Sequence, residues 1–270
     1  MNACVSAVQH IRRLRGGSQA QLLRATDNQY YVTKFQNNPQ HVRVLANEML
    51  ATRLGELLGL PVPRVMAIEV CDWLIEYSGE LRLDIAGLRT SFKPGIHLAS
   101  AYAVDPTTGH LFDYLPEGLL QEVTNVKDFA RVTVLDKWTC NADGRQAVFS
   151  RQAKRRATYK ATFIDQGYCF NAGEWNFPDS PLRGVYARNC VYNHVTGWDA
   201  FEPALTRAEE MDIDQIWGIA AEIPAEWYES DTAGLKRLVE GLHCRRSAIR
   251  GLITAFRHST RTPFPNWTSA

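Results

Sequence analysis

The chain of 270 residues lacks several features that would place it in a class at once. It has no apolar run near the roughly 20 residues that cross a bilayer, and its first residues lack the apolar core of a signal peptide. Its formal net charge is only +1 at pH 7, which removes any whole-protein argument for binding to nucleic acid or to a membrane. These absences predict a cytoplasmic protein without nucleic-acid or membrane contacts.

Paired cysteines and metal-ligand spacings are also missing. The six cysteines are scattered and form no Cys-x-x-Cys pair, which predicts reduced thiols. His194 and His243 have no partner at a metal-ligand spacing, so we interpret both as surface or structural residues. The basic stretches 151–160 and 243–261 predict a solvated hairpin and a helix face rather than partner sites.

What is present is an ordinary globular composition, 45% hydrophobic and 22% charged, with enough length for two lobes around a cleft. Residues 21–23 and 30–32 flank a polar turn and predict a β-hairpin. Asn38 is a suitable N-cap for a helix whose leucines recur at helical spacing and which ends at Gly59. Further on, the pattern predicts strands at 65–70, 73–76 and about 92–102, an irregular stretch at 104–123, a helix at 126–138, a hairpin of 147–149 with 161–164, and helices beyond about 185.

Lys34 ends a predicted strand and precedes Glu48 of the predicted helix by fourteen residues, the layout of a buried lysine and its carboxylate partner in protein-kinase-like folds. Gly16, Gly17 and Ser18 form a turn upstream, where such folds cover the nucleotide phosphates. The alternative is that Lys34 and Glu48 are both exposed. Against it, Glu48 shares a helix face with apolar residues, where a carboxylate needs a partner.

A polar loop follows the helix predicted at 126–138. It carries Asn141, Asp143 and Gln146, and Asp143 is placed to accept or orient the proton of an attacking hydroxyl. Turns use the same residue types for their own hydrogen bonds, so an ordinary turn is the alternative. The loop predicts a catalytic segment in which Asp143 is the central residue.

Asp165 follows Asp143 by 22 residues with one predicted hairpin between them, so both carboxylates can face one cleft. Mg²⁺ binds a few protein carboxylates and leaves positions for phosphate and water, which suits Asp165 as a metal ligand. The alternative is a strand-end aspartate that starts a turn before Gly167.

The order of these parts resembles the HipA-like kinases, distant relatives of the protein, phosphatidylinositol and actin-fragmin kinases. The resemblance runs from about Gly16 to Trp198. It is most specific at Lys34-Phe35, Asn47-Glu48-Met49, Leu60-Pro61-Val62-Pro63, Asn141-Ala142-Asp143 and Ile164-Asp165.

The resemblance implies an α+β, two-lobed protein-kinase-like fold. A small β-rich N-lobe with one helix would span residues 1–100, and a larger, mainly helical C-lobe would span 101–270. It also implies ATP and Mg²⁺ as cofactors, with Lys34, Glu48, Asp143 and Asp165 in the roles described above. Residues 95–102 would lie near the interlobe hinge, where backbone groups meet adenine.

Two departures from the kinase pattern bear on activity. A metal-binding asparagine usually comes five residues after the catalytic aspartate, and here that position is Val148. Gln146 is the substitute, with a chemically similar amide oxygen on a longer arm. The glycine loop is short, so Ser18 is expected to supply a hydroxyl or an amide to a phosphate.

Three functions therefore stand side by side. The first is a kinase that phosphorylates a Ser or Thr hydroxyl of a protein, itself included. The second is an ATP-binding pseudokinase or regulatory module, and the third is a kinase of a small-molecule acceptor. The resemblance adds an antitoxin-like protein as a candidate partner.

Overall fold

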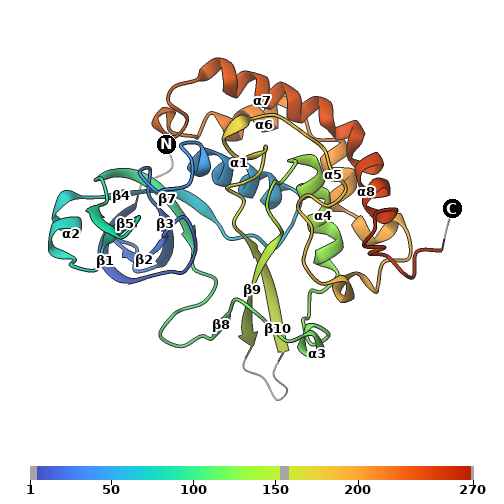
Figure 1. Ribbon diagram of the computed structural model, residues 1–270, viewed down its shortest axis with the longest axis horizontal. Helices are drawn as coiled ribbons and strands as arrows, with labels where there is room; N and C mark the ends of the chain where they lie inside the picture. The colour runs from blue at the N-terminus through green and yellow to red at the C-terminus, as the bar shows by residue number, and fades with distance from the viewer. Residues whose placement is uncertain (1–4, 153–157, 269–270) are drawn as a thin grey trace.

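A closed five-stranded β-barrel forms the N-terminal part of the computed structural model, which describes residues 5–152 and 158–268 (Figure 1). The strands are arranged in the order β1–β2–β3–β7–β4, and the parallel pairing of β1 with β4 closes the barrel. Their bounds are Val5–Arg13 (β1), Gln21–Ala25 (β2), Tyr30–Lys34 (β3), Val65–Val70 (β4) and Gly95–Ala101 (β7). Closure leaves none of these strands at a free edge.

The predicted hairpin at 21–23 and 30–32 is confirmed, since Leu22 pairs with Val32 in the antiparallel β2–β3 ladder. Residues of alternate positions point into the barrel, where Leu23, Ile68 and Ala99 are completely buried. The barrel therefore has its own apolar core, and Lys34 stands at the end of one of its central strands.

Helix α1 (Val44–Leu57) lies between the barrel and the helical part of the chain (Figure 1). The prediction of Asn38 as the N-cap is wrong by five residues, because the observed N-cap is Arg43. Asn38 instead accepts a hydrogen bond from the Gln40 backbone through its side-chain oxygen, at 3.0 Å, and closes a turn before the helix. The predicted end is confirmed, since the helix stops before Gly59, whose φ of +78° is in the left-handed region.

The segment predicted as a strand at 73–76 is helix α2 (Asp72–Tyr77), so the first hundred residues contain two helices rather than one. Leu74 and Ile75 are buried while Trp73 and Tyr77 are exposed, a pattern too short to distinguish a helix from a strand by periodicity. The hairpin of β5 (Arg82–Ile85) and β6 (Leu88–Ser91) that follows has no counterpart in the predictions.

A three-stranded sheet, in the order β10–β9–β8, adjoins the barrel and projects away from the helices (Figure 1). Its strands are Leu111–Phe112 (β8), Gln146–Gln152 (β9) and Thr158–Ile164 (β10). The predicted hairpin is confirmed by the pairing of Phe149 with Ala161, while residues 153–157 of the predicted basic tip lie outside the described residues. β8 and the short helix α3 (Glu117–Leu120) correct the prediction of an irregular 104–123 segment.

Helix α4 (Asp128–Trp138) is the centre of the C-terminal part, and its predicted span is nearly that observed. It packs against helices from the predicted all-helical region. The helices of that region are Ala204–Glu209 (α5), Ile213–Ala220 (α6), Thr232–Arg245 (α7) and Ile249–Arg257 (α8). Short 3-10 helices lie at Asn189–Tyr192, Trp198–Phe201, Ala225–Tyr228 and Arg246–Ala248, and another precedes the region at Ala172–Glu174. The division of the chain into lobes at residue 100 stays a prediction.

Two expectations from the composition concern thiols and membranes. Five cysteines are free thiols, and Cys4 lies outside the described residues. Over residues 5–152 and 158–268, every helix is too short or too polar to cross a bilayer.

Candidate functional site

Lys34 and Glu48 form a buried ion pair between the barrel and α1. Lys34 is the last residue of β3, and its Nζ lies 2.7 Å from Oε2 of Glu48. Their side chains are only 9% and 3% exposed, so the alternative of two exposed residues is wrong. A buried pair in this geometry fixes the lysine ammonium at one point of the site.

Asp165 is the third member of this group. It directly follows β10, and its Oδ1 lies 2.8 Å from Lys34 Nζ, so one ammonium serves two carboxylates. Burial by itself would lower the pKa of Lys34, but Glu48 and Asp165 outweigh it and hold that pKa above its usual value. Burial would raise the pKa of Asp165, and the Lys34 charge overcomes this and lowers it. Both groups are therefore charged at neutral pH.

A cavity of about 500 Å³ opens beside these three residues. Val32 and Ile164 give it apolar walls, and residues 100–103, which overlap the segment 95–102 predicted to lie near the hinge, line it as well. The volume is within the range of about 300–1,000 Å³ that ligand pockets occupy. The cavity is thus large enough for a nucleotide whose phosphates would approach Lys34.

The predicted phosphate loop connects β1 to β2 at one rim of the cavity. Its ends are held by a hydrogen bond of 2.8 Å from the Leu14 amide to the Ala20 carbonyl. Gly16 has a φ of +126°, a conformation that requires glycine. Ser18 lines the cavity, whereas Gly16 and Gly17 are not among the lining residues. The glycines therefore shape the loop and Ser18 is the residue that faces the cleft.

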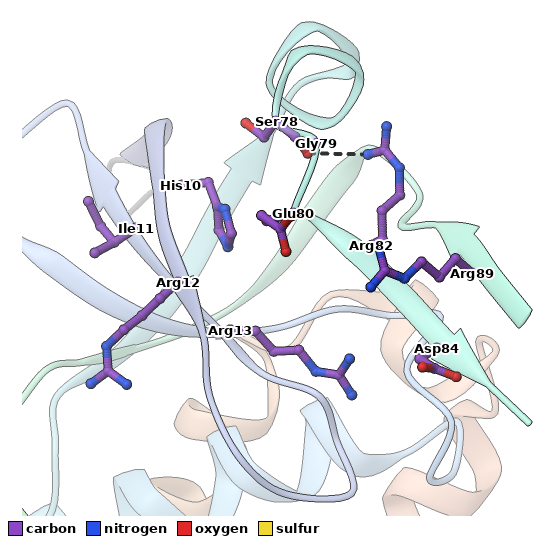
Figure 2. Close-up of a pocket in the computed structure, with 10 residues that line it drawn as sticks. All are labelled: His10, Ile11, Arg12, Arg13, Ser78, Gly79, Glu80, Arg82, Asp84 and Arg89. Atoms are coloured by element: carbon purple, nitrogen blue, oxygen red, sulfur yellow. Dashed lines mark hydrogen bonds between the residues drawn. The ribbon is translucent and has the colours of Figure 1, made fainter. Parts of the chain in front are cut away.

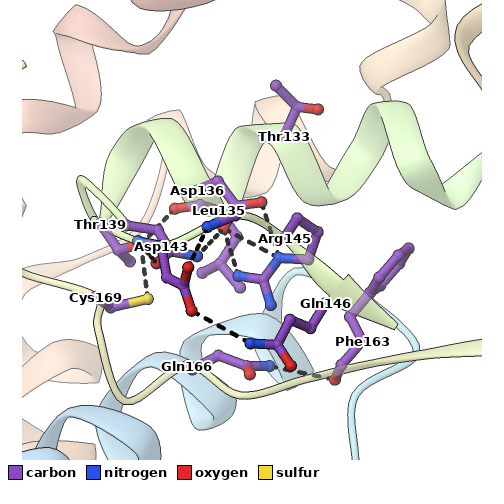
Figure 3. Close-up of polar contacts among 12 residues, drawn as sticks. Thr133, Leu135, Asp136, Thr139, Asp143, Arg145, Gln146, Phe163, Gln166 and Cys169 are labelled. Carbon is purple, nitrogen blue, oxygen red and sulfur yellow. Dashed lines mark hydrogen bonds and ion pairs between the residues drawn. The ribbon is translucent and has the colours of Figure 1, made fainter. Parts of the chain in front are cut away.

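Asp143 and Gln146 lie side by side where the loop after α4 leads into β9 (Figure 3). Asp143 is exposed, and its Oδ2 accepts a hydrogen bond of 3.2 Å from Nε2 of Gln146. Gln146 lines the cavity and is also one of the groups that lower the pKa of Asp165. The structure thus brings both predicted carboxylates to the same glutamine, although Asp143 itself is not among the lining residues.

Val148, at the position where kinases usually have a metal-binding asparagine, forms part of the cavity wall and offers no metal ligand. Val148 belongs to β9, pairs with Thr162 of β10, and lines the cavity with its apolar side chain. Asp165 and Gln146 have side-chain oxygens of the kind that Mg²⁺ prefers, and the carboxylates of Glu48 and Asp113 line the same cavity. In the described part of the chain no cluster of three or more His, Cys, Asp or Glu could hold a metal by itself. The donor set therefore fits Mg²⁺ only if nucleotide phosphates complete the coordination.

A buried ion pair that the sequence did not reveal holds the loop around Asp143 (Figure 3). Asp136 of α4 is fully buried and receives a bidentate contact from the guanidinium of Arg145, with Nε to Oδ2 at 3.0 Å. Asn141 Nδ2 donates to Asp136 Oδ1 at 2.9 Å, and Arg145 Nη1 donates to the Ile164 carbonyl at 2.9 Å. The loop is therefore tied both to α4 and to the strand that delivers Asp165.

Asn47, the neighbour of Glu48 on α1, binds the segment that follows Asp165. Its Nδ2 donates to the carbonyls of Gly167, Cys169 and Ala172 at 3.0, 3.1 and 2.7 Å. Its Oδ1 accepts from Trp175 Nε1 at 2.7 Å. One buried amide thus fastens α1, which carries Glu48, to the segment that runs on from Asp165. In the sequence, Asn47 stood out only as a member of the Asn47-Glu48-Met49 stretch of the family resemblance, which gave it no role.

Comparison with known proteins gives a family and a fold. A family model described as HipA-like kinase matches residues 7–154, more than half of the chain. No curated protein matches.

Solved structures show similar folds at low sequence identity. The Golgi casein kinase with Mn/ADP bound has a TM-score of 0.54 at 10% identity, covering 95% of this chain and 73% of its own. The Helicobacter pylori proinflammatory kinase CtkA has a TM-score of 0.55 at 16% identity, covering 91% of this chain and 99% of its own. The overall architecture is therefore kinase-like.

Proposed function

The chain belongs to the HipA-like kinases, and from this premise we propose that it is a Mg²⁺- and ATP-dependent kinase that phosphorylates a Ser or Thr hydroxyl of a protein, itself included. The observation that carries the proposal is the buried Lys34, held by Glu48 and Asp165 at the wall of a nucleotide-sized cavity. A similar fold solved with Mn/ADP supports the choice of a nucleotide and a divalent metal.

In this proposal Lys34 binds the α- and β-phosphates and Glu48 holds its ammonium in place. Gly16, Gly17 and Ser18 form the loop over the phosphates. Asp165 and Gln146 would hold the metal, which when bound neutralises charge on the phosphates.

Asp143 orients the attacking hydroxyl and accepts its proton. Its exposure suits this role, because an acceptor hydroxyl on another polypeptide must reach it from solvent. The Asp136–Arg145 pair acts through the loop and positions Asp143 without touching the substrate.

The test is phosphate incorporation from γ-labelled ATP into the chain itself and into arrayed Ser, Thr and Tyr peptides. Asp143→Asn should lower the rate by roughly 10²- to 10⁴-fold, while the exposed Asp199→Asn serves as the matched control. Equal labelling by the wild type and Asp143→Asn would refute the assignment of Asp143.

A second function, an ATP-binding module without turnover, is favoured by one observation. Gln146 directs its amide nitrogen toward Asp143, so its oxygen would have to turn inward to bind a metal. A melting-temperature increase with ATP and Mg²⁺, combined with no labelling of any acceptor, would favour this function over the first.

A further inference from the structure

A second cavity, of about 460 Å³, lies on the side of the barrel between β1 and the β5–β6 hairpin (Figure 2). Four arginines line it, together with only two carboxylates. These residues are Arg12, Arg13, Arg82, Arg89, Glu80 and Asp84. The cavity therefore has a local excess of positive charge, whereas the net charge of the whole chain is only +1.

The register of the strands explains why the arginines converge. Arg82 and Asp84 of β5 are two residues apart and share one face of the hairpin, and Arg89 of β6 pairs directly with Asp84. The opposite face of β5 carries Leu83, which is buried in the barrel core.

On the facing strand, β1 has an irregularity in its pairing between His10 and Arg12. Such a bulge re-aims side chains, so that the consecutive residues Arg12 and Arg13 both line the cavity. Strands β1, β5 and β6 thus all contribute arginines to the lining, although the Arg12 side chain points away from those of Arg13 and Arg89 (Figure 2).

These charges are not neutralised within the described part of the chain. None of the four arginines forms an ion pair within 4.0 Å there, and Arg13 and Arg89 have no hydrogen-bond partner for their side chains in it. Arg12 donates to the Tyr102 hydroxyl at 3.1 Å, and Arg82 donates to the carbonyls of Ile75 and Leu81. Two guanidinium groups are therefore available for an anion.

We propose that this cavity binds a phosphorylated Ser or Thr side chain of an extended polypeptide. A guanidinium presents paired N–H donors that match the oxygens of a phosphate, and two of them beside further positive charge favour a dianion. The volume exceeds what a bare phosphate needs and leaves room for the residues next to it.

The free edge of β6 supports a polypeptide as the source of that phosphate. Among the described residues, β6 pairs with β5 alone and its four residues are exposed; at its end, the Ser91 carbonyl accepts a hydrogen bond of 3.3 Å from Asn37 Nδ2. Such an edge can accept the main chain of an added strand, which would place an alternate side chain near Arg89.

The cavity adjoins the nucleotide site, because Arg12 and Arg13 line both. Arg89 lines only the second cavity, so it is the residue whose change separates the two sites. Binding to this cavity requires no catalysis, so its failure is distinguishable from failure of the proposed kinase activity.

The experiment captures the full chain on an immobilised library of peptides with a central phosphoserine and degenerate flanks, and on the same library with serine. The affinity of the selected peptide is then measured by fluorescence anisotropy, with inorganic phosphate as competitor. We expect capture by the phosphoserine library alone and at least a tenfold loss of affinity in Arg89→Glu. Arg237→Glu, an exposed change on α7, is the matched control and should bind as the wild type does.

Arg89→Lys keeps the positive charge but loses the paired N–H donors of the guanidinium, so this variant should bind the phosphopeptide with intermediate affinity. Unchanged melting temperature and ADP binding in Arg89→Glu would show that the variant is folded. The proposal is overturned if neither library captures the chain, if both capture it equally, or if Arg89→Glu binds as well as the wild type. Displacement by inorganic phosphate at the same concentration as the unlabelled peptide would overturn the polypeptide source.

Discussion

Replacing Asn47 tests whether the position of Glu48 depends on the segment that follows Asp165. Asn47→Asp preserves the size of the side chain and keeps an acceptor for Trp175. It removes the amide hydrogens that reach the carbonyls of Gly167, Cys169 and Ala172. It also directs a carboxylate at three carbonyl oxygens, an arrangement that repels.

The expected magnitude follows from burial. Asn47 is 1% exposed, so water cannot replace the missing donor at these carbonyls. A buried polar group left without its partner costs about 1–3 kcal/mol, and two amide hydrogens are removed. We therefore expect the free energy of unfolding to fall by about 2–6 kcal/mol, a large share of the ~5–15 kcal/mol of a typical domain.

The assay is urea denaturation of both proteins, with amide hydrogen exchange followed in residues 167–175. Exchange there should accelerate more than in the barrel, because the hydrogen bonds that Asn47 donates all end in this segment. The affinity for ADP with Mg²⁺ should also fall, because Glu48 lies next to Asn47 on α1. Asn193→Asp, at an exposed asparagine, controls for the added charge.

A single pattern of results would refute this reasoning. If Asn47→Asp shows wild-type stability and wild-type exchange in residues 167–175, the amide does not fasten the segment to α1. Loss of stability with unchanged ADP affinity would separate the two claims and refute the link to Glu48.

Three further predictions concern buried charges. Lys34→Met should abolish ADP binding and lower stability by about 3–5 kcal/mol because Glu48 is left buried and unpaired; the double change with Glu48→Met should recover most of the stability, by urea denaturation, but not the binding. Asp136→Asn should lower stability by a similar amount, because it leaves the Arg145 guanidinium buried without its carboxylate partner. If the pair positions the loop, Asp136→Asn should also lower the labelling rate as much as Asp143→Asn does. His97 is fully buried, with its pKa lowered by burial to about 4; the unfolded chain takes up the proton near pH 6.5, so the free energy of unfolding should fall by up to ~3 kcal/mol between pH 6.5 and pH 4. His97→Gln should lack that part of the pH dependence, and an unchanged slope in this variant would contradict the assignment.

The sequence alone predicted the placement of several candidate site residues because their signals are local. Strand-end and helix positions fix the spacing of Lys34 and Glu48, and a hairpin between two loops fixes that of Asp143 and Asp165. The spacing of apolar residues identified α1, α4 and the β9–β10 hairpin. Apolar residues recur at helical spacing in the two helices and form short runs in the strands. Element ends were less certain, as the start of α1 shows, because Asn38 can cap a helix or close a turn with the same side chain.

Only the tertiary structure decided which polar residues hold the site together. Asn47 reaches residues more than 100 positions away, and nothing near it in the chain indicates which carbonyls it will meet. The convergence of Arg13 with Arg89 likewise depends on packing between strands distant in sequence. The Asp136–Arg145 pair spans only nine residues, but it depends on how the loop folds back onto α4. Short-range patterns specify elements and the residues at their ends. Which residues of different elements form hydrogen bonds or ion pairs is decided only in the folded chain, because the free energy of these interactions depends on burial and on distance in space.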